Sequence, residues 1–404
     1  MINILVVSSK YPPEPSGSGL RAYHTYQRLA AKFNIHYEVL CSSVKFNRTE
    51  RYSHEGVPVY RIASKIFKNI EGGYKLARKI AHGVNYLSEG ALTWGYLLRN
   101  GRRFDLIHLF GNSGYMTPAV LTYAKMTDKP SIIESCNVPN DMKPFYEPLI
   151  AKMLFGKGLP RRSQVVCISR RLKEMWNKSG SSGGREIWCR PNPVDVSRFF
   201  MDRAKKMFYR DKLGLFGKED IVMVTVGKIR PLKNQIFLID VLKDLPREYK
   251  LVIAGPPISD EPYAGKEKGY LDQMKSKIEA YGLADRVRLE ERFIENVDEY
   301  IKASDIYLLP SKMEACATAL LEALACGIPT VAHRIEGVTT DWIQEGVNGY
   351  LAPLEEKAFR GKISLARQLG VQGLEDSAHK LIGTVSTEIV DREYKNLING
   401  LLDG

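Results

Sequence analysis

Residues 305–326 read DIYLLPSKMEACATALLEALAC, and this stretch predicts a strand, a loop and a helix in succession. The apolar run at residues 305–311 is typical of a short buried strand. Residues 318–326 are rich in Ala, Leu and Glu, which favour a helix. Gly327 and Pro329 follow directly, and both residue types are signals that end a helix.

Two glutamates lie beside this predicted strand-to-helix junction. Glu314 falls on the loop, and Glu322 falls about one turn inside the helix. The first-turn N–H groups of a helix have no partner within the helix, so they form a ready anion site. Two carboxylates beside an anion site suit a ligand that carries both phosphates and hydroxyl groups. The alternative is a solvated helix, where two glutamates eight residues apart are common.

Length and composition predict a two-domain globular protein. The chain has 404 residues, of which 26% are charged and 44% hydrophobic. The start MINILVVSSK has no basic leader, and no segment approaches the roughly 18 to 20 apolar residues of a membrane span. The cysteines are scattered without a Cys-x-x-Cys pair, which favours reduced thiols and a cytoplasmic location over a zinc site.

The formal net charge of +13 points to an anionic partner or to a generally basic surface. The sequence carries no nucleic-acid recognition signature, so we expect no nucleic-acid partner. Phosphorylated small molecules and an anionic membrane surface are the better candidates. Residues 66–98 mix apolar and basic side chains and could dock peripherally on anionic lipid, although a helix that simply covers a sheet has the same pattern.

Two successive series of strands and helices predict two α/β domains. Several strands are continuous apolar runs, as expected for parallel strands covered on both faces. Doubly wound sheets of this kind bind ligands at the carboxyl ends of their strands. The predicted strands of the first series are residues 2–8, 35–42, 105–110, 131–135, 164–169 and 186–190, and those of the second are 221–227, 250–255, 286–290, 305–310 and 330–333.

A basic loop leaves the first strand of the second series. Its sequence GKIRPLKN (residues 227–234) places Lys228, Arg230 and Lys233 after a strand-end glycine, Gly227. Cations at such a strand end could stabilise the negative charge of a departing diphosphate. The alternative is an ordinary solvated basic loop.

A glycine-containing loop follows the first strand of the chain. The sequence SGSG at residues 16–19 opens a predicted helix, and Gly17 and Gly19 would let backbone N–H groups approach a ligand closely. An ordinary flexible turn has the same sequence.

Together these segments resemble one known family. The pattern Glu-x7-Glu after a hydrophobic strand ending in Pro-Ser, followed by Ala-Cys-Gly-x-Pro, resembles the donor site of retaining GT-B glycosyltransferases of family 4, the glycogen-synthase-like "glycosyl transferases group 1". The resemblance implies two Rossmann-like doubly wound domains facing across a cleft. We expect an acceptor-binding domain at residues 1–198 and a nucleotide-sugar domain at residues 199–384. Residues 385–404 would form a helix that crosses back to the first domain.

The same resemblance implies a reaction and its partners. The chain would move a hexose from a UDP- or GDP-linked sugar to an acceptor hydroxyl, with retention of configuration and without a metal or cofactor. Glycan or lipid-linked acceptors would place it in cell-surface polysaccharide or glycolipid synthesis.

The resemblance also implies roles for individual residues. Lys228, Lys233 and Glu314 would be catalytic: the lysines stabilise the leaving diphosphate and the glutamate faces the sugar hydroxyls. The donor would be bound by the ribose contact of Glu322, by the amides of Thr318 and Ala319, by Phe293 beside the base, and by Gly17, Gly19 and Arg230.

The chain departs from the family pattern at several positions, and Cys136 together with Ala315 and Ala317, where relatives often have glycine, favours an alternative function. Lys228 replaces the usual arginine and cannot offer a bidentate fork. Cys136 or Asn137, the possible acceptor-side residues, stand where many relatives have a histidine beside the reacting sugar. A catalytically degenerate sugar-nucleotide-binding subunit, or a membrane-associated partner of another glycosyltransferase, is therefore the alternative.

Overall fold

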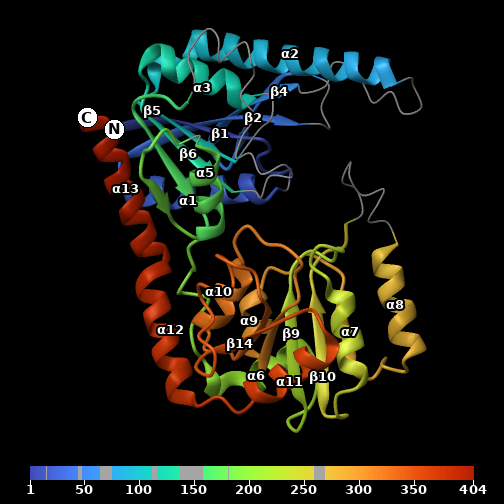
Figure 1. Cartoon of the computed structure of the whole chain (residues 1–404). Coiled ribbons are helices and arrows are strands. Elements are labelled where there is room, and N and C mark those ends of the chain that lie inside the picture. Colours follow the sequence, from blue (N-terminus) through green and yellow to red (C-terminus); the bar gives the residue numbers. More distant parts are fainter. Residues whose placement is uncertain are drawn as a thin grey trace. The chain divides into compact units, whose positions relative to one another are not determined.

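The computed structural model describes residues 1–14, 16–43, 48–63, 75–111, 116–136, 158–180, 182–258 and 269–404. These residues divide into two compact units (Figure 1). The first unit combines Met1–Pro191 with Val390–Gly404, and the second unit is Asn192–Ile389. The chain therefore passes from one unit to the other a few residues before the predicted 198/199 boundary, and returns a few residues after the predicted 384/385 boundary.

The first unit is built on an eight-stranded sheet in the order β3-β4-β2-β1-β5-β6-β7-β8. All described neighbours pair in parallel except β3 and β4, which are antiparallel. Its strands are β1 (Ile2–Ser8), β2 (Ile35–Ser43), β3 (Glu50–His54), β4 (Val57–Ala63), β5 (Leu106–Phe110), β6 (Ser131–Ser135), β7 (Ser163–Cys167) and β8 (Ile187–Cys189). Its α-helices include α1 (Gly17–Lys32), α2 (Lys75–Asn100), α3 (Met116–Thr127), α5 (Arg170–Ser179) and α13 (Thr387–Asp403).

The second unit is built on a six-stranded parallel sheet in the order β11-β10-β9-β12-β13-β14. Numbered within the unit this order is 3-2-1-4-5-6, the doubly wound arrangement, and its switch point lies between β9 and β12. The strands are β9 (Ile221–Val226), β10 (Tyr249–Ala254), β11 (Val287–Glu290), β12 (Ile306–Leu309), β13 (Thr330–His333) and β14 (Gly349–Ala352). The α-helices include α6 (Lys206–Leu213), α7 (Gln235–Lys243), α8 (Tyr270–Ala280), α9 (Val297–Lys302), α10 (Thr318–Ala325), α11 (Glu356–Ala366) and α12 (Val371–Val385).

The prediction of two α/β units with mainly parallel sheets is confirmed, but three strands were missed. The β3–β4 hairpin lies at a sheet edge, and its sequences ERYSH and VPVYRIA lack a continuous apolar run because only part of each strand is buried. Glu55 and Gly56 between them both have positive φ, as a tight hairpin requires, but Glu-Gly is not one of the dipeptides that typically mark such a turn. β14 has only four residues, too few for a recognisable period.

The C-terminal helix α13 is joined to the first unit by buried ion pairs. Arg21 Nε lies 2.5 Å from Glu134 Oε2, and the Tyr394 hydroxyl donates to the same carboxylate. Asp391 accepts from Arg28 Nε at 3.0 and 3.1 Å. Burial alone would raise the pKa of Glu134, but the Arg21 guanidinium and His108 hold it at about 2. The carboxylate is therefore ionised at neutral pH and stabilises the docked helix.

Glu89, on α2, is a buried carboxyl group with no cation beside it among the described residues. It gives a first testable prediction. Only 1% of Glu89 is exposed, and burial raises its pKa to about 7 against an opposing hydrogen bond from Ser42. Because the folded-state pKa is raised, this carboxyl does not change the free energy of unfolding below about pH 4.5. The free energy of unfolding then falls as the pH rises from about 4.5 through about 7. The shift corresponds to about 3 kcal/mol. Glu89→Gln should therefore stabilise the protein by about 1 to 3 kcal/mol at pH 8 and much less at pH 5.

Urea denaturation of the wild type and Glu89→Gln at both pH values checks this prediction. Glu174→Gln is the matched control, because Glu174 pairs with Arg170 on α5 with 44% of its side chain exposed. An equal effect of Glu89→Gln at pH 5 and pH 8 would show that the buried carboxyl does not titrate in this range.

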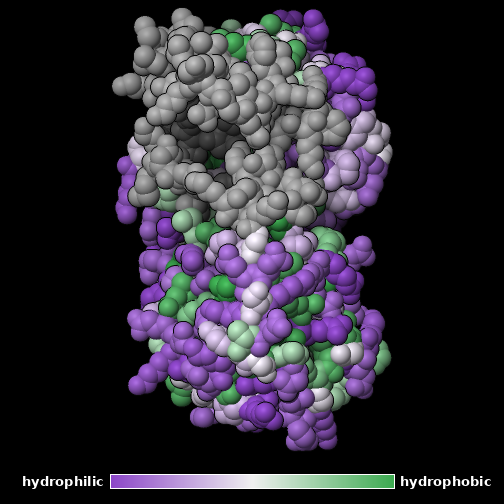
Figure 2. Space-filling view, turned by 90° about the vertical axis from the view of Figure 1, so that its right-hand side faces the viewer, coloured by the Kyte–Doolittle hydropathy of each residue, from purple (hydrophilic) through white to green (hydrophobic). Residues whose placement is uncertain are grey.

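The surface carries no described helix that is long and apolar enough to cross a membrane. In Figure 2, hydrophobic residues of the second unit are interspersed with hydrophilic ones on the face shown. Scattered exposed apolar residues of this kind are ordinary on protein surfaces.

Candidate active site

Two neighbouring strands of the second sheet, β9 and β10, end close together at the carboxyl ends of the strands. β9 runs into Gly227 and the neighbouring β10 runs into Gly255, with backbone φ values of 147° and 151° that side chains rarely allow. A Cβ added to Gly255 would collide with the carbonyl oxygen of Gly227. The two backbones therefore need glycine in order to pack this closely. The sequence analysis placed Gly227 in the predicted ligand site, whereas it identified Gly255 only as the last residue of a strand.

The basic loop at residues 227–234 is held in shape by backbone hydrogen bonds. Gln235 Nε2 donates to the Lys228 carbonyl at 2.9 Å, and the Lys233 N–H donates to the Arg230 carbonyl at 3.0 Å. The Lys312 N–H, on the loop after β12, donates to Leu232 at 2.9 Å. The cation-bearing loop after β9 and the acidic loop after β12 are therefore joined across the switch point.

Lys233 and Glu314, 81 residues apart in the chain, meet at this junction. Lys233 Nζ lies 2.5 Å from Glu314 Oε1. Glu314 is 8% exposed, so its charge is matched by the ammonium rather than by water. An incoming phosphate would compete for an ammonium that is already at the strand ends.

The Thr318 amide, which was expected to contact the diphosphate, already has an acceptor within the protein. The Thr318 N–H donates to the Cys316 carbonyl at 3.0 Å, and the Thr318 hydroxyl accepts a 2.6 Å hydrogen bond from Asn192. The Leu320 amide donates to Ala317 at 3.0 Å. Within the described residues this leaves Ala319 as the first-turn amide without an acceptor, so only one of the two predicted anion contacts is available in this conformation.

Glu322 lies on α10, at the side of Glu314. It is partly exposed, and burial raises its pKa to about 7, with the Arg198 guanidinium opposing the rise. Tyr307 of β12 lies buried beside both glutamates. Its pKa is raised first by burial and then by the charges of Glu322 and Glu314. The Tyr307 hydroxyl is therefore close enough to both predicted carboxylates for their charges to affect its pKa.

The remaining predicted donor residues lie on other strand ends. Lys228 and Arg230 are half-buried on the loop at residues 227–234. Phe293 follows β11 and is 69% exposed, which is unusual for a large aromatic side chain. Gly17 and Gly19 belong to the first unit, at the start of α1.

The two predicted glycines of α1 have different surroundings. The Gly19 amide donates to the Ser16 hydroxyl at 2.9 Å, and a Cβ at Gly19 would collide with the Lys10 carbonyl. Gly19 is therefore explained by packing and its N–H is already used within the protein. A Cβ at Gly17 would meet nothing within 4 Å, so space remains beside that residue.

Cys136 ends β6 in a buried cluster, and Asn137 lies outside the described residues. The Cys136 Sγ is 3.6 Å from Glu134 Oε2, and burial raises the pKa of the thiol well above its usual value. His108 shares a 2.8 Å hydrogen bond with Tyr26 and has its pKa lowered by burial. The thiol and the imidazole are therefore neutral groups beside an ionised Glu134.

A cavity of about 440 Å³ also lies in the second unit, but at the opposite edge of the sheet. Its lining includes Asp220, Asp305 and Pro329, which directly precede β9, β12 and β13. The amino ends of the strands, rather than the carboxyl ends, border this cavity. It is separate from the residues predicted from the sequence.

Comparison with known proteins finds a family model that matches part of this unit. Residues 206–368 match the family model described as "Glycosyl transferases group 1". This part of the chain is similar to that family. A D-inositol 3-phosphate glycosyltransferase of Geodermatophilus obscurus is 30% identical over 169 residues, which cover 40% of this chain and 35% of that protein. The chain spans less than half of the length of the curated group 1 relatives that it matches.

Solved structures extend the likeness to the whole fold. HepE of Anabaena in complex with UDP and glucose has a TM-score of 0.71 at 15% identity, covering 99% of this chain and 100% of HepE. Sucrose-phosphate synthase of Thermosynechococcus elongatus has a TM-score of 0.74 at 16% identity, with 100% of both chains covered. The chain therefore has the GT-B fold of two Rossmann-like units, as predicted.

Proposed function

We propose that this chain is a retaining, metal-independent glycosyltransferase that moves a hexose from a nucleoside diphosphate sugar to an acceptor hydroxyl. The observation that carries the proposal is the Lys233–Glu314 pair at the switch point of a doubly wound sheet. Ligands of such sheets bind at this edge. The group 1 match covers the same residues.

The proposed chemistry assigns each group of this site a task. The acceptor oxygen bonds to the anomeric carbon while the bond from that carbon to the phosphate oxygen breaks. The nucleoside diphosphate leaves with the electron pair, and its phosphate oxygen takes the proton of the acceptor hydroxyl on the same face. Lys233, Lys228 and the Ala319 amide stabilise the charge that develops on the diphosphate. Glu314 accepts hydrogen bonds from the sugar hydroxyls, and Glu322 accepts from the ribose.

A donor panel tests the activity directly. Purified protein is incubated with UDP- and GDP-linked hexoses, with and without a mixture of simple glycan and lipid-linked acceptors, and release of nucleoside diphosphate is followed. We expect acceptor-dependent release with one donor, and EDTA should not change it. Absence of release from every donor, together with no binding of any nucleoside diphosphate, would contradict the proposal.

Glu322 makes donor binding depend on pH. With a pKa of about 7, about a tenth of the carboxyl groups are ionised at pH 6 and about nine-tenths at pH 8. Because the ionised form accepts from the ribose hydroxyls, the donor KM should rise by about 10-fold from pH 8 to pH 6. Glu322→Gln should show a high KM at both values. A wild-type KM that is constant over this range would remove Glu322 from the donor site.

A binding subunit without transfer activity is the second candidate, and Cys136 is the observation that favours it. A buried neutral thiol at the end of β6 cannot make the contact of an imidazole. In that case the chain binds a nucleoside diphosphate sugar but releases nothing from it. Binding measured by calorimetry alongside the release assay separates the two functions.

Solved structures of similar fold suggest the donor base and the acceptor. UDP in the HepE complex favours a uridine donor, and WaaG, described as involved in lipopolysaccharide biosynthesis, favours a glycolipid or cell-surface glycan acceptor. We propose a cytoplasmic protein that docks on anionic membrane through α2 and the basic residues after it. Residues 66–74 of the predicted docking segment lie outside the described residues. Flotation with liposomes that contain or lack anionic lipid tests this docking.

A further inference from the structure

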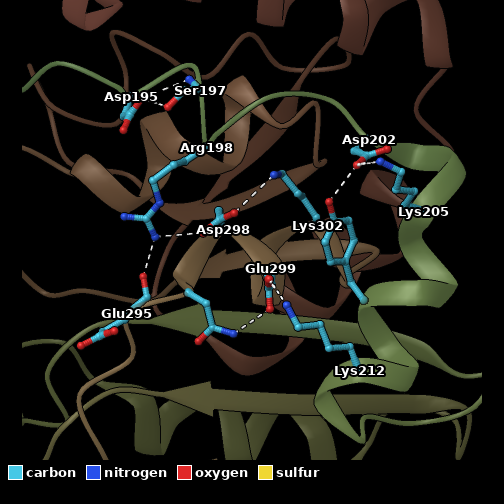
Figure 3. A network of polar contacts seen from close by, with 12 residues as sticks. Asp195, Ser197, Arg198, Asp202, Lys205, Lys212, Glu295, Asp298, Glu299 and Lys302 are labelled. Atoms are coloured by element: carbon cyan, nitrogen blue, oxygen red, sulfur yellow. Dashed lines mark hydrogen bonds and ion pairs between the residues drawn. The ribbon is translucent and has the colours of Figure 1, made fainter.

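The segment after Asn192 forms a turn that directs Arg198 away from the core. Asp195 Oδ1 accepts from the Ser197 N–H at 3.0 Å and from the Ser197 hydroxyl at 2.6 Å. The Asp195 carbonyl accepts from the N–H groups of Arg198 and Phe199. Phe199 is buried in the core, whereas 45% of the Arg198 side chain is exposed. The turn therefore buries Phe199 and leaves Arg198 on the surface; Figure 3 shows the turn at Asp195 and Ser197 and the side chain of Arg198.

The Arg198 guanidinium fastens the loop at residues 291–296, which connects β11 to α9. Its Nη2 donates to the Glu295 carbonyl at 2.5 Å and to Asp298 Oδ1 at 2.9 Å (Figure 3). Asp298 is in the first turn of α9, and its other oxygen lies 3.3 Å from Lys302 Nζ. A single guanidinium nitrogen thus joins the end of the loop to the start of the helix through charge-assisted hydrogen bonds.

Further contacts hold the same end of the loop. Ile294 is buried in the core of the unit. Asn296 Nδ2 donates to Glu299 Oε2 at 2.7 Å, and Lys212 Nζ lies 2.5 Å from the other carboxylate oxygen of Glu299. Residues 294–296 are therefore fixed, and the exposed ring of Phe293 precedes them directly. An aromatic ring kept in water by such anchors is available to a ligand.

The position of this ring suits the base of a nucleotide whose diphosphate lies at the switch point. β11 is two strands away from β9, which borders the switch point, a separation of about 10 Å. In a nucleoside diphosphate the ribose stands between the base and the phosphates, so the base can lie at a neighbouring strand end while the phosphates lie at the switch point. Stacking of a base on an aromatic side chain typically changes affinity by about 10-fold or more.

We infer that Arg198 is a positioning residue for the nucleobase: it fixes the loop at residues 291–296 so that Phe293 can stack on the base. This inference rests on the proposed function and adds a residue that acts through Phe293 rather than by touching the phosphates. Without the guanidinium, the Glu295 carbonyl loses its donor and the ring loses its fixed position.

A double-mutant cycle on nucleoside diphosphate binding tests the inference. Calorimetry gives the Kd of UDP, GDP and ADP for the wild type, Arg198→Ala, Phe293→Ala and the double variant. For the preferred nucleotide, each single variant should raise the Kd by about 10-fold. At pH 9, where Glu322 is ionised with or without the Arg198 guanidinium, the double variant should be no weaker than the weaker single variant, because both changes then remove the same stacking contact.

Two comparisons separate this role from general structural support. Arg198→Lys keeps the charge but cannot reach both acceptors, so its Kd should fall between those of the wild type and Arg198→Ala. Arg360→Ala, which removes a distant ion pair to Asp244, should leave the Kd unchanged. The inference would be overturned if the Kd of the double variant rose by the product of the two single fold-changes. An unchanged Kd in Arg198→Ala would also overturn it. If the wild type binds none of the three nucleotides, the proposed function itself fails, and this inference fails with it.

Discussion

Replacing Lys233 by alanine is expected to lower kcat for sugar transfer by about 100-fold or more, because one preorganised cation at a leaving group typically contributes that much. The ammonium lies 2.5 Å from Glu314 Oε1, and the Lys233 side chain passes next to Gly227. During transfer the diphosphate gains charge at this edge of the sheet. Lys233→Ala also removes the cation that offsets Glu314, so the remaining carboxylate would repel the diphosphate. Steady-state kinetics with the preferred donor measures the loss.

Lys243→Ala is the matched control for Lys233→Ala. Lys243 is another lysine of the second unit, and its Nζ lies 3.5 Å from Glu356 at the far end of α7. Its loss should leave kcat within about 2-fold, as expected for a surface ion pair of small energetic effect. Thermal unfolding of both variants should show a retained cooperative transition. Near-normal turnover by a folded Lys233→Ala would exclude the lysine from the reaction.

Glu314→Ala and Glu314→Gln are expected to separate transfer from nucleotide binding. Both variants remove the negative acceptor for the sugar hydroxyls, and the loss of a charged hydrogen bond of about 1.5 to 3 kcal/mol lowers kcat/KM by about 10- to 100-fold. Both also release the Lys233 ammonium from its ion pair. The Kd of the free nucleoside diphosphate should therefore stay the same or fall. Transfer assays and calorimetry on the same preparations give both quantities.

The opposite directions of these two effects make the Glu314 prediction specific. A protein that is merely destabilised by the substitution would lose transfer and nucleotide binding together. Glu322→Gln is a useful companion, because it should weaken nucleotide binding as well as transfer. Glu314→Gln could instead weaken binding of the nucleoside diphosphate as much as binding of the sugar nucleotide. In that case Glu314 would act by positioning Lys233 rather than by contacting the sugar.

The site could be predicted as far as local sequence controls it. The strand ends at Gly227 and Pro310 were visible as apolar runs followed by glycine or proline, and parallel strands bring their carboxyl ends to one edge. For this reason Lys233 and Glu314 were both assigned to the site. Their direct ion pair was not predictable, because it depends on the bond between Lys312 and Leu232 that joins the two loops.

Other features depend on contacts between distant segments. The Thr318 amide was expected to bind phosphate, but the loop conformation turns it toward the Cys316 carbonyl. The close approach of the Lys10 carbonyl to Gly19 was likewise not predictable, because it depends on how the loop before α1 folds. Arg198 and Glu295 are 97 residues apart, and neither residue alone carries a recognisable signal. Sequence patterns locate strand ends, but side-chain pairing across them is set by tertiary packing.

The central claim is that the carboxyl edge of the six-stranded sheet binds the diphosphate of a nucleotide. A crystal structure of the chain with UDP tests it most directly. We expect phosphate oxygens within hydrogen-bonding distance of Lys233 Nζ and the Ala319 amide, the ribose at Glu322 and the base against Phe293. UDP bound instead in the cavity bordered by Asp220 and Asp305, with Lys233 still paired to Glu314, would contradict the account.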